Sequence, residues 1–109
     1  MNKPKDIINK DEQGRYHGIC ECYYENGYLI YRGYFHHGKA HGISEYYHDN
    51  GELWYKRYFH HGKFHGLCKR YYSNGYLNYK GHYHYGKLHG FWESYYANGN
   101  LRLKEYYIR

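Results

Sequence analysis

The chain has 109 residues, of which 24% are aromatic, and its 16 lysines and arginines outnumber its 10 acidic residues, for a formal net charge of +6 at pH 7. This length is that of one domain, and the aromatic content excludes a disordered chain. The basic balance favours acidic partners: anionic lipid, nucleic acid or an acidic protein.

The first 13 residues match the rest of the chain weakly. We expect a frayed entry segment or a short edge strand, for which Pro4 is suited. Ile7 and Ile8 do not make the continuous apolar core of a signal peptide. No later apolar run approaches the roughly 18 residues that a membrane span needs. We therefore expect a soluble, cytoplasmic protein.

From residue 14 onward the chain repeats itself every 24 residues. Two dipeptides recur at this spacing without a gap, at His17-Gly18, His41-Gly42, His65-Gly66 and His89-Gly90, and at Asn26-Gly27, Asn50-Gly51, Asn74-Gly75 and Asn98-Gly99. Such self-similarity predicts an array of structural repeats. We divide the chain into an entry segment, residues 1–13, and four tandem repeats, residues 14–109.

Each repeat contains two apolar and aromatic runs separated by Asn-Gly, a strong signal for a β-hairpin with a type I′ turn. Four such turns predict eight antiparallel strands. A two-residue turn at Asn26-Gly27 places Glu21 opposite Arg32, and opposite charges in such a pair support the register. Continued across the sheet, this register predicts a central charge ladder of Glu21, Arg32, Glu45, Lys56, Lys69, Lys80, Glu93 and Lys104.

The opposite face is predicted to be more apolar and to carry a row in which glycines alternate with aromatic rings. A six-residue loop between Phe35 and Gly42 places these two residues side by side, so that a ring covers each glycine. The row reads Gly18, Phe35, Gly42, Phe59, Gly66, Tyr83, Gly90 and Tyr107. No stretch has the apolar period of a helix. The sequence therefore predicts an all-β protein, a single-layer twisted antiparallel sheet of tandem 24-residue β-hairpins.

Three cysteines indicate a reducing compartment. Cys68 lies about four strands, or ~19 Å, from Cys20 and Cys22, whereas a disulfide requires Cα atoms within about 7 Å. Cys20-Glu21-Cys22 as half of a metal or redox motif is disfavoured, because no second pair completes it.

Within each repeat the pattern is Gly-Lys-x-His-Gly, a tyrosine, Asn-Gly-x-Leu and a closing aromatic residue. It stands as Gly38-Lys39-Ala40-His41-Gly42, Tyr47, Asn50-Gly51-Glu52-Leu53 and Phe59. These residues resemble the MORN repeat, more closely the bacterial-type variant of proteins labelled as toxin-antitoxin-type antitoxins. The resemblance implies an elongated sheet used for protein association, with lipid contact in some members and no catalytic residues. Arg57 and Glu105 depart from it, because the other repeats have Gly33 and Gly81 there.

The histidines near the loops suggest metal binding, since imidazoles bind zinc, nickel and copper. Equivalent histidines in successive repeats are about 9.6 Å apart, however, whereas the ligands of one metal converge to bonds of ~2.0 to 2.1 Å. We therefore predict solvated loop histidines, with no metal and no cofactor. A catalytic site is also disfavoured, because the glutamates face basic partners and no acid faces a cysteine or histidine in a covered cleft. We expect a non-enzymatic protein.

Two groups of basic residues are better candidates for binding. Lys56, Lys69 and Lys80 follow one another in the ladder without an intervening acid. A second group is predicted to form a stripe along one edge of the sheet: Arg15, Lys39, Lys63 and Lys87. Such a stripe attracts an anionic membrane surface with about 1 kcal/mol per residue. The competing interpretation is solvated charge that keeps the sheet soluble.

Aromatic residues are predicted to extend the first group into a site of Tyr34, Trp54, Lys56, Tyr58, Lys69 and Lys80. Trp54 is singled out, since the other repeats have Ile30, Asn78 and Arg102 there. We expect another protein as the partner, and hence a scaffold or adaptor. The alternatives are peripheral binding to anionic membrane lipids and an antitoxin-like role toward a toxin protein. Nucleic acid is disfavoured because most tyrosines lie in packing rows, and end-strand self-association is a further option.

Overall fold

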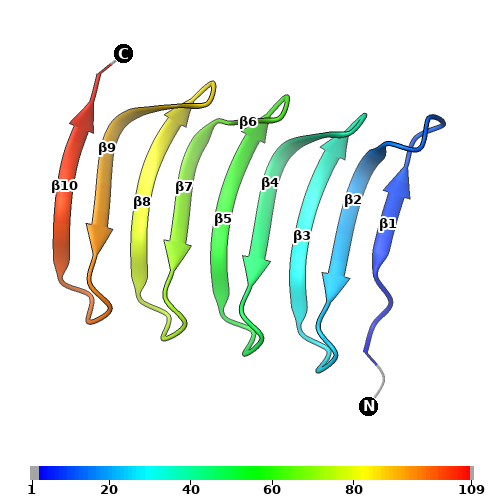
Figure 1. Cartoon of the computed structure of the whole chain (residues 1–109), viewed down its shortest axis with the longest axis horizontal. Coiled ribbons are helices and arrows are strands. Elements are labelled where there is room, and N and C mark those ends of the chain that lie inside the picture. The colour runs from blue at the N-terminus through cyan, green and yellow to red at the C-terminus, as the bar shows by residue number, and fades with distance from the viewer. Residues whose placement is uncertain (1–2, 109) are drawn as a thin grey trace.

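The computed structural model describes residues 3–108 and consists of one open antiparallel sheet (Figure 1). Its strands are β1 (Ile7–Lys10), β2 (Tyr16–Tyr23), β3 (Leu29–His36), β4 (Lys39–Tyr47), β5 (Leu53–His60), β6 (Lys63–Phe64), β7 (Gly66–Tyr71), β8 (Leu77–His84), β9 (Lys87–Tyr95) and β10 (Leu101–Tyr107). The strands follow one another across the sheet in their order along the chain. The short β6 is the exception, because both β6 and β7 pair with β5.

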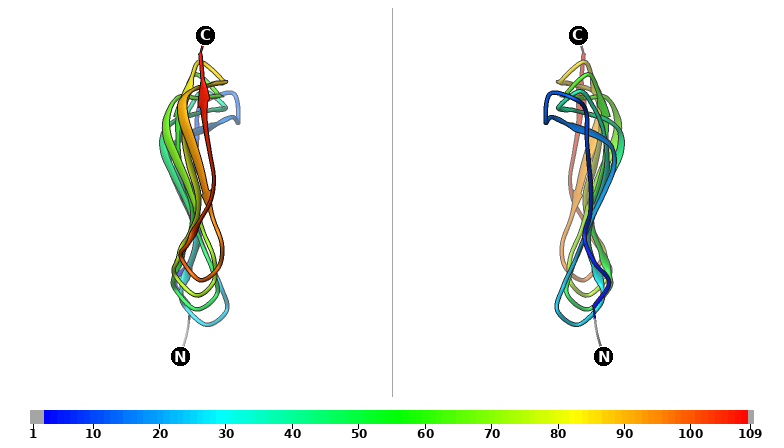
Figure 2. Two further views of the ribbon diagram at one scale, coloured as in Figure 1. Left: turned by 90° about the vertical axis from the view of Figure 1, so that its left-hand side faces the viewer. Right: turned by 90° about the vertical axis from the view of Figure 1, so that its right-hand side faces the viewer.

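The sheet is a single twisted layer. Its principal extents are 43 × 36 × 11 Å, and edge-on views show one thin, twisted ribbon of strands (Figure 2). Residues 3–108 contain no helix, so nothing covers either face. The predicted all-β, single-layer antiparallel fold is therefore confirmed. Within the same residues, no helix of the length and apolarity needed to cross a membrane is found.

The predicted number of strands, eight, is wrong, because residues 3–108 form ten. Of the two options for the entry segment, a short edge strand forms: β1 pairs with β2, with Ile8 opposite Cys20. The tenth strand arises because the first strand of the third repeat is interrupted at His65, between β6 and β7. The backbone N–H of His65 donates instead to the carbonyl oxygen of Tyr58, 2.8 Å away.

The charge ladder is confirmed along its whole length. Each member lies directly opposite the next one on the neighbouring strand, from Glu21 opposite Arg32 to Glu93 opposite Lys104. Arg32 Nε donates to Glu21 Oε2 at 2.5 Å. This charged hydrogen bond lowers the pKa of Glu21 and raises that of Arg32. The ladder therefore fixes the register at the middle of the strands.

The Asn-Gly turns differ from the predicted two-residue type. Gly27 N–H donates to Tyr24 O at 2.9 Å, and Tyr24 N–H donates to Tyr28 O at 2.8 Å. Gly27 has a positive φ of 93°, whereas Asn26 does not. This geometry is a three-residue loop, a type I turn that ends in a left-handed glycine. A bulge between Cys22 and Tyr23 compensates for the extra loop residue, so the ladder keeps the predicted register.

The true two-residue turns lie at the opposite end of the strands. His37 and Gly38 both have positive φ, 46° and 86°, and they connect the paired residues His36 and Lys39. The predicted six-residue loop is therefore wrong. Phe35 lies opposite Ala40 and not beside Gly42, so the predicted glycine-aromatic row is interrupted at the tight turns. Within each hairpin its pairs form as predicted, for example Gly18 opposite Phe35 and Gly42 opposite Phe59.

The glycines of that row have another role. Gly42 has a φ of 90°, and no atom lies within 4 Å of the position that a Cβ would occupy. At Gly66, which has a φ of 96°, the atom nearest to the Cβ position belongs to Tyr58, at 3.7 Å, and not to Phe59 or Tyr83. These positions require glycine because its backbone readily adopts a positive φ, whereas a residue with a Cβ does so only at an energetic cost.

Aromatic rings do cover glycines in a different row. A Cβ at Gly81 would lie 2.6 Å from the Trp92 ring, and one at Gly33 would collide with the Tyr31 side chain. In the second repeat Arg57 replaces this glycine, and its guanidinium lies over the Tyr55 ring at 4.2 Å. The buried side chains of this face are small: Cys20, Ser44, Cys68 and Ser94. All three cysteines are free: Cys20 and Cys68 are buried, and Cys22 is partly exposed.

Candidate functional site

Three lysines lie side by side at the centre of the ladder. Lys56 on β5, Lys69 on β7 and Lys80 on β8 are directly opposite one another. Lys80 Nζ lies 3.9 Å from Glu93 Oε1, whereas neither Lys56 nor Lys69 forms an ion pair with any residue in 3–108. Like charges directly opposite destabilise a sheet. The three lysines therefore concentrate positive charge that does not stabilise the sheet.

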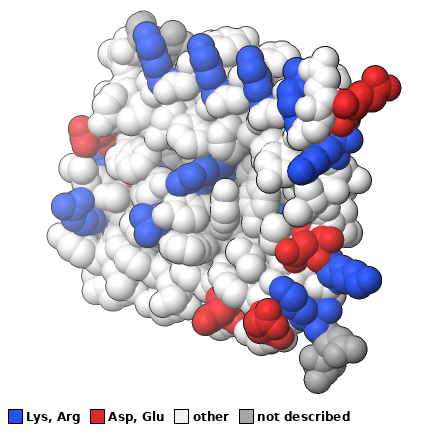
Figure 3. Space-filling model, turned by 45° about the vertical axis from the view of Figure 1, so that its right-hand side comes forward, with Lys and Arg blue, Asp and Glu red and all other residues white. Residues whose placement is uncertain are grey.

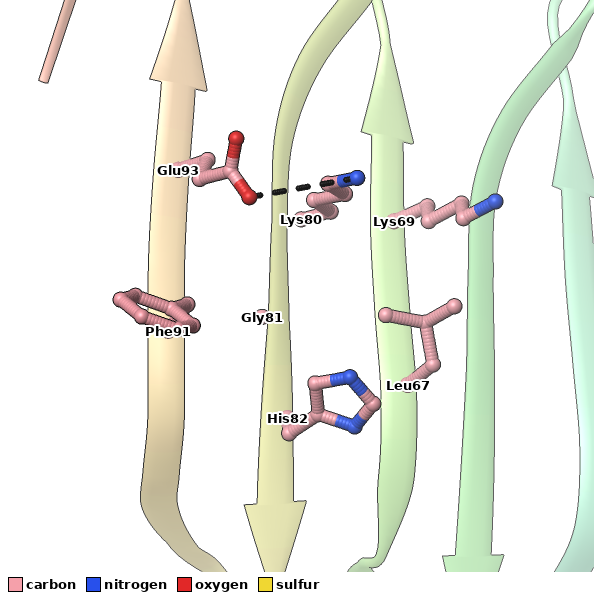
Figure 4. Close-up of a pocket in the computed structure, with 7 residues that line it drawn as sticks. All are labelled: Leu67, Lys69, Lys80, Gly81, His82, Phe91 and Glu93. Carbon is pink, nitrogen blue, oxygen red and sulfur yellow. Dashed lines mark ion pairs between the residues drawn. The ribbon is translucent and has the colours of Figure 1, made fainter. Parts of the chain in front are cut away.

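Shallow hollows accompany these lysines. The larger, of about 210 Å³, is lined by Leu67, Lys69, Lys80, Gly81, His82, Phe91 and Glu93. In Figure 4 the ammonium groups of Lys69 and Lys80 point the same way along the sheet, while Leu67, His82 and Phe91 lie below them. A second hollow lies between Lys56, Tyr58, Leu67 and Lys69. We call this area the lysine surface: Lys56, Tyr58, Leu67, Lys69, Lys80 and His82.

The predicted aromatic extension of the site forms only in part. Tyr58 lies with Lys56 and Lys69, and Tyr34 is on the same face but on β3, separated from Tyr58 by β4. Trp54 does not join them, because its ring stacks on His48 at a centroid distance of 4.9 Å.

The position of Trp54 follows from a bulge. Tyr47 pairs with Leu53 and Tyr46 with Tyr55, so Trp54 is the extra residue between two pairs. Its ring lies 5.0 Å from that of Tyr55 and 6.0 Å from the Arg70 guanidinium, which also lies over Tyr55. Trp54 is therefore packed among residues of the face opposite the ladder.

The predicted basic stripe is present at the edge with the tight turns. Lys39, Lys63 and Lys87 lie opposite His36, His60 and His84, respectively, next to those turns. Basic side chains follow one another along this edge in Figure 3. The side-chain carbons of Lys39 and Lys63 lie along the turn glycine of the following repeat. Arg15, the first member, is ion-paired with Asp11 at 2.8 Å.

Histidines at the same edge come together in a way that the sequence reasoning missed. Nitrogen atoms of His17, His36 and His37 lie within 4.8 Å of one another, and so do those of His41, His60 and His61. These histidines therefore do converge, contrary to the expectation from the spacing of equivalent positions in successive repeats. The tight turn brings non-equivalent histidines together, and the spacing i, i+19, i+20 is the signal that identifies them. We call these groups the histidine triads.

Comparison with known proteins gives a family and no individual relative. The family model of the MORN repeat variant matches four consecutive segments: residues 16–37, 40–61, 64–85 and 88–109. No curated protein and no solved structure matches the chain. The match is to the repeat variant as a whole and does not single out antitoxin-type proteins, and MORN repeats in general are associated with binding proteins or membrane lipids. Since the four matched segments cover most of the chain, it belongs to the MORN repeat variant family.

Proposed function

We propose that this protein is a non-enzymatic binding module and that its lysine surface binds an acidic segment of a partner protein. The observation that carries this proposal is the row of Lys56, Lys69 and Lys80, directly opposite one another and, for the first two, without an ion pair within the described residues. In a sheet whose other ladder positions alternate in sign, such a row lowers stability. An acidic ligand would neutralise it.

The shape and composition of the surface favour a protein ligand. The lysines line hollows, and Tyr58, Leu67 and Phe91 supply apolar contacts within them. Side chains of a protein enter hollows of this size, whereas a bilayer presents a broad surface. Interfaces combine such aromatic anchors with charged groups. A glutamate- or aspartate-rich segment with apolar residues between its acids has the matching chemistry.

One observation favours the second candidate, an anionic membrane. Lys39, Lys63 and Lys87 lie along a single edge of the sheet and form no ion pair within residues 3–108. A linear set of this kind contacts a flat surface better than the lysine surface does. Nothing in the sheet favours a toxin over another acidic protein as partner.

The two candidates are separated by two triple variants of equal charge. One carries Lys56→Gln, Lys69→Gln and Lys80→Gln, and the other carries Lys39→Gln, Lys63→Gln and Lys87→Gln. Each is titrated with a glutamate-rich peptide and with vesicles containing phosphatidylserine, at low and moderate salt. We expect the first triple variant to lose peptide binding by more than tenfold while the second retains most of it. Equal loss in both variants would show unspecific charge attraction. Loss of vesicle binding only in the second variant, with weak peptide binding throughout, would favour the membrane.

A further inference from the structure

The two histidine triads form a type of site that the proposed binding function does not use. In the first, His17 comes from β2, His36 ends β3, and His37 occupies the following turn. The ring centroids are 5.2 Å apart for His17 and His36, and 4.4 Å apart for His17 and His37. We propose that each triad binds one divalent transition-metal ion of the class that prefers imidazole, Zn²⁺, Ni²⁺ or Cu²⁺.

The geometry of the triads is close to that of a three-histidine site. Two nitrogens bound to one zinc ion at a tetrahedral angle are about 3.4 Å apart. The nitrogens of each triad already lie within 4.8 Å of one another, and four of the six side chains are exposed: His36, His37, His41 and His61. Three protein ligands leave a fourth position for water or for a ligand from a partner.

The charges around the two triads are mixed. The charged side chains next to the triads are Lys39 opposite His36 and Lys63 opposite His60, with Asp11 and Arg15 at the first triad.

Asp11 distinguishes the first triad from the second. His37 Nδ1 lies 2.7 Å from Asp11 Oδ2, which fixes the ring and leaves Nε2 for a metal. Histidine ligands commonly donate their other N–H to a carboxylate in this way, and its loss typically weakens metal affinity 10- to 100-fold. The bond from His37 N–H to His17 Nδ1, at 3.1 Å, opposes binding, because whichever nitrogen of His17 takes the metal, Nδ1 ceases to be an acceptor. The corresponding bond from His61 to His41 is longer, 3.4 Å.

The third repeat provides an internal control. Its equivalent residues are His65, His84 and Tyr85, and Tyr85 has a φ of 48°, like His61. The Tyr85 ring lies 4.8 Å from that of His65, so an aromatic ring suffices for packing at this turn. Exchanging histidine and tyrosine at this turn position therefore adds or removes one metal ligand and preserves the turn and the ring contact.

The test is calorimetric titration of the full, untagged, chelator-treated chain with ZnCl₂ at neutral pH. We expect two zinc ions per chain. His37→Tyr and His61→Tyr should each remove one ion, Tyr85→His should add a third, and Asp11→Asn should weaken one of the two sites 10- to 100-fold. Circular dichroism checks that each variant is folded.

Several results would overturn the proposal. These are an absence of saturable zinc binding by the wild-type chain, retention of both ions by the double variant of His37→Tyr and His61→Tyr, and no third ion after Tyr85→His in a folded protein. Because none of these substitutions touches the lysine surface, peptide binding serves as an independent readout. Failure of the metal proposal leaves the proposed function unaffected.

Discussion

Lys56 lies directly opposite Lys69 across β5 and β7, so that two positive charges occupy one cross-strand pair. The equivalents of Lys69 in the other repeats are Glu21, Glu45 and Glu93. The third repeat thus breaks the alternation of charge at a single position. A residue that weakens the sheet at one repeat only is better explained by binding than by folding.

We predict that Lys69→Glu stabilises the protein while it abolishes binding of an acidic ligand. The substitution replaces two like-charge pairs, with Lys56 and with Lys80, by opposite-charge pairs. At this half-exposed location we expect a gain of about 0.5 to 1 kcal/mol in the free energy of unfolding, measured in urea at low salt. Glu93→Lys is the control, since it makes the reverse change and should destabilise. A lower urea midpoint for Lys69→Glu would contradict our interpretation of the row.

The sequence was sufficient to predict the middle of the strands. Complementary charges such as those of Glu21 and Arg32 mark residues that face each other, and the 24-residue period extends that one pair to the whole ladder. No comparable chemistry marks the strand ends. A two-residue Asn-Gly turn without a bulge and a three-residue turn with a bulge at Ile30 give the same register in the ladder, so the pattern does not distinguish them.

The residues that sequence reasoning misplaced lie at those ends. Trp54 is the extra residue of a bulge, and the histidine triads depend on a tight turn with His37 in the left-handed region. Histidine at that position is not the glycine, asparagine or aspartate that signals a type I′ turn. The lysine surface, by contrast, lies in the ladder, and the structure brings Lys56, Lys69 and Lys80 together as predicted.

We predict that Gly42→Val is destabilising because of backbone conformation and not because of crowding. Gly42 has a φ of 90° and open space around the position of a Cβ. We expect a loss of about 1 to 3 kcal/mol in the free energy of unfolding, a typical cost for a residue held in an unfavourable region. Gly42→Asn should cost less, because asparagine tolerates positive φ better. Equal urea midpoints for the two variants would mean that φ does not determine the cost.

Acidification should destabilise the sheet in two separate ranges. The pKa of His36 and of His60 is lowered from 6.5, so the unfolded chain binds more protons and stability falls as pH decreases below about 6.5. The pKa of Glu21 is lowered from 4.5 by Arg32, so its contribution is lost only at lower pH. Urea midpoints between about pH 7.5 and 5.5 isolate the histidines. A double variant, His36→Asn and His60→Asn, should respond less to pH. If the urea midpoint of the double variant falls with pH as steeply as that of the wild type, these two rings are not the cause.

The C-terminal edge of the sheet should allow self-association. β10 is seven residues long, and it exposes Leu101, Leu103 and Tyr106. An open edge strand with exposed apolar side chains can pair with a second chain, although Arg102, Lys104 and Glu105 in the same strand oppose this pairing. We predict a dimer at high concentration by sedimentation equilibrium, and a monomer for Leu103→Lys. Ile8→Lys, on the four-residue strand β1 at the other edge, is the control and should leave the dimer intact. A wild-type chain that stays monomeric at all concentrations would refute this prediction.

Substitutions of Trp54 and of Tyr58 should distinguish a residue that packs within the sheet from a residue that binds the ligand. The Trp54 ring stacks on His48 and lies within reach of the Arg70 guanidinium, so Trp54→Ala removes an aromatic pair and a cation-π contact. We expect a loss of about 1 to 2 kcal/mol in the free energy of unfolding, with unchanged affinity for the glutamate-rich peptide in the folded protein.

This expectation reverses the one drawn from the sequence, in which Trp54 was the main binding residue. Tyr58 takes that role, because it lines the hollow between Lys56 and Lys69 and keeps 36% of its surface exposed. Tyr58→Ala should weaken peptide binding by roughly tenfold or more, as the loss of an interface anchor does. Calorimetric titration and urea unfolding of both variants give the two quantities separately. If Trp54→Ala weakens peptide binding while Tyr58→Ala does not, the ligand lies on the opposite face, and the lysine surface is not the binding site.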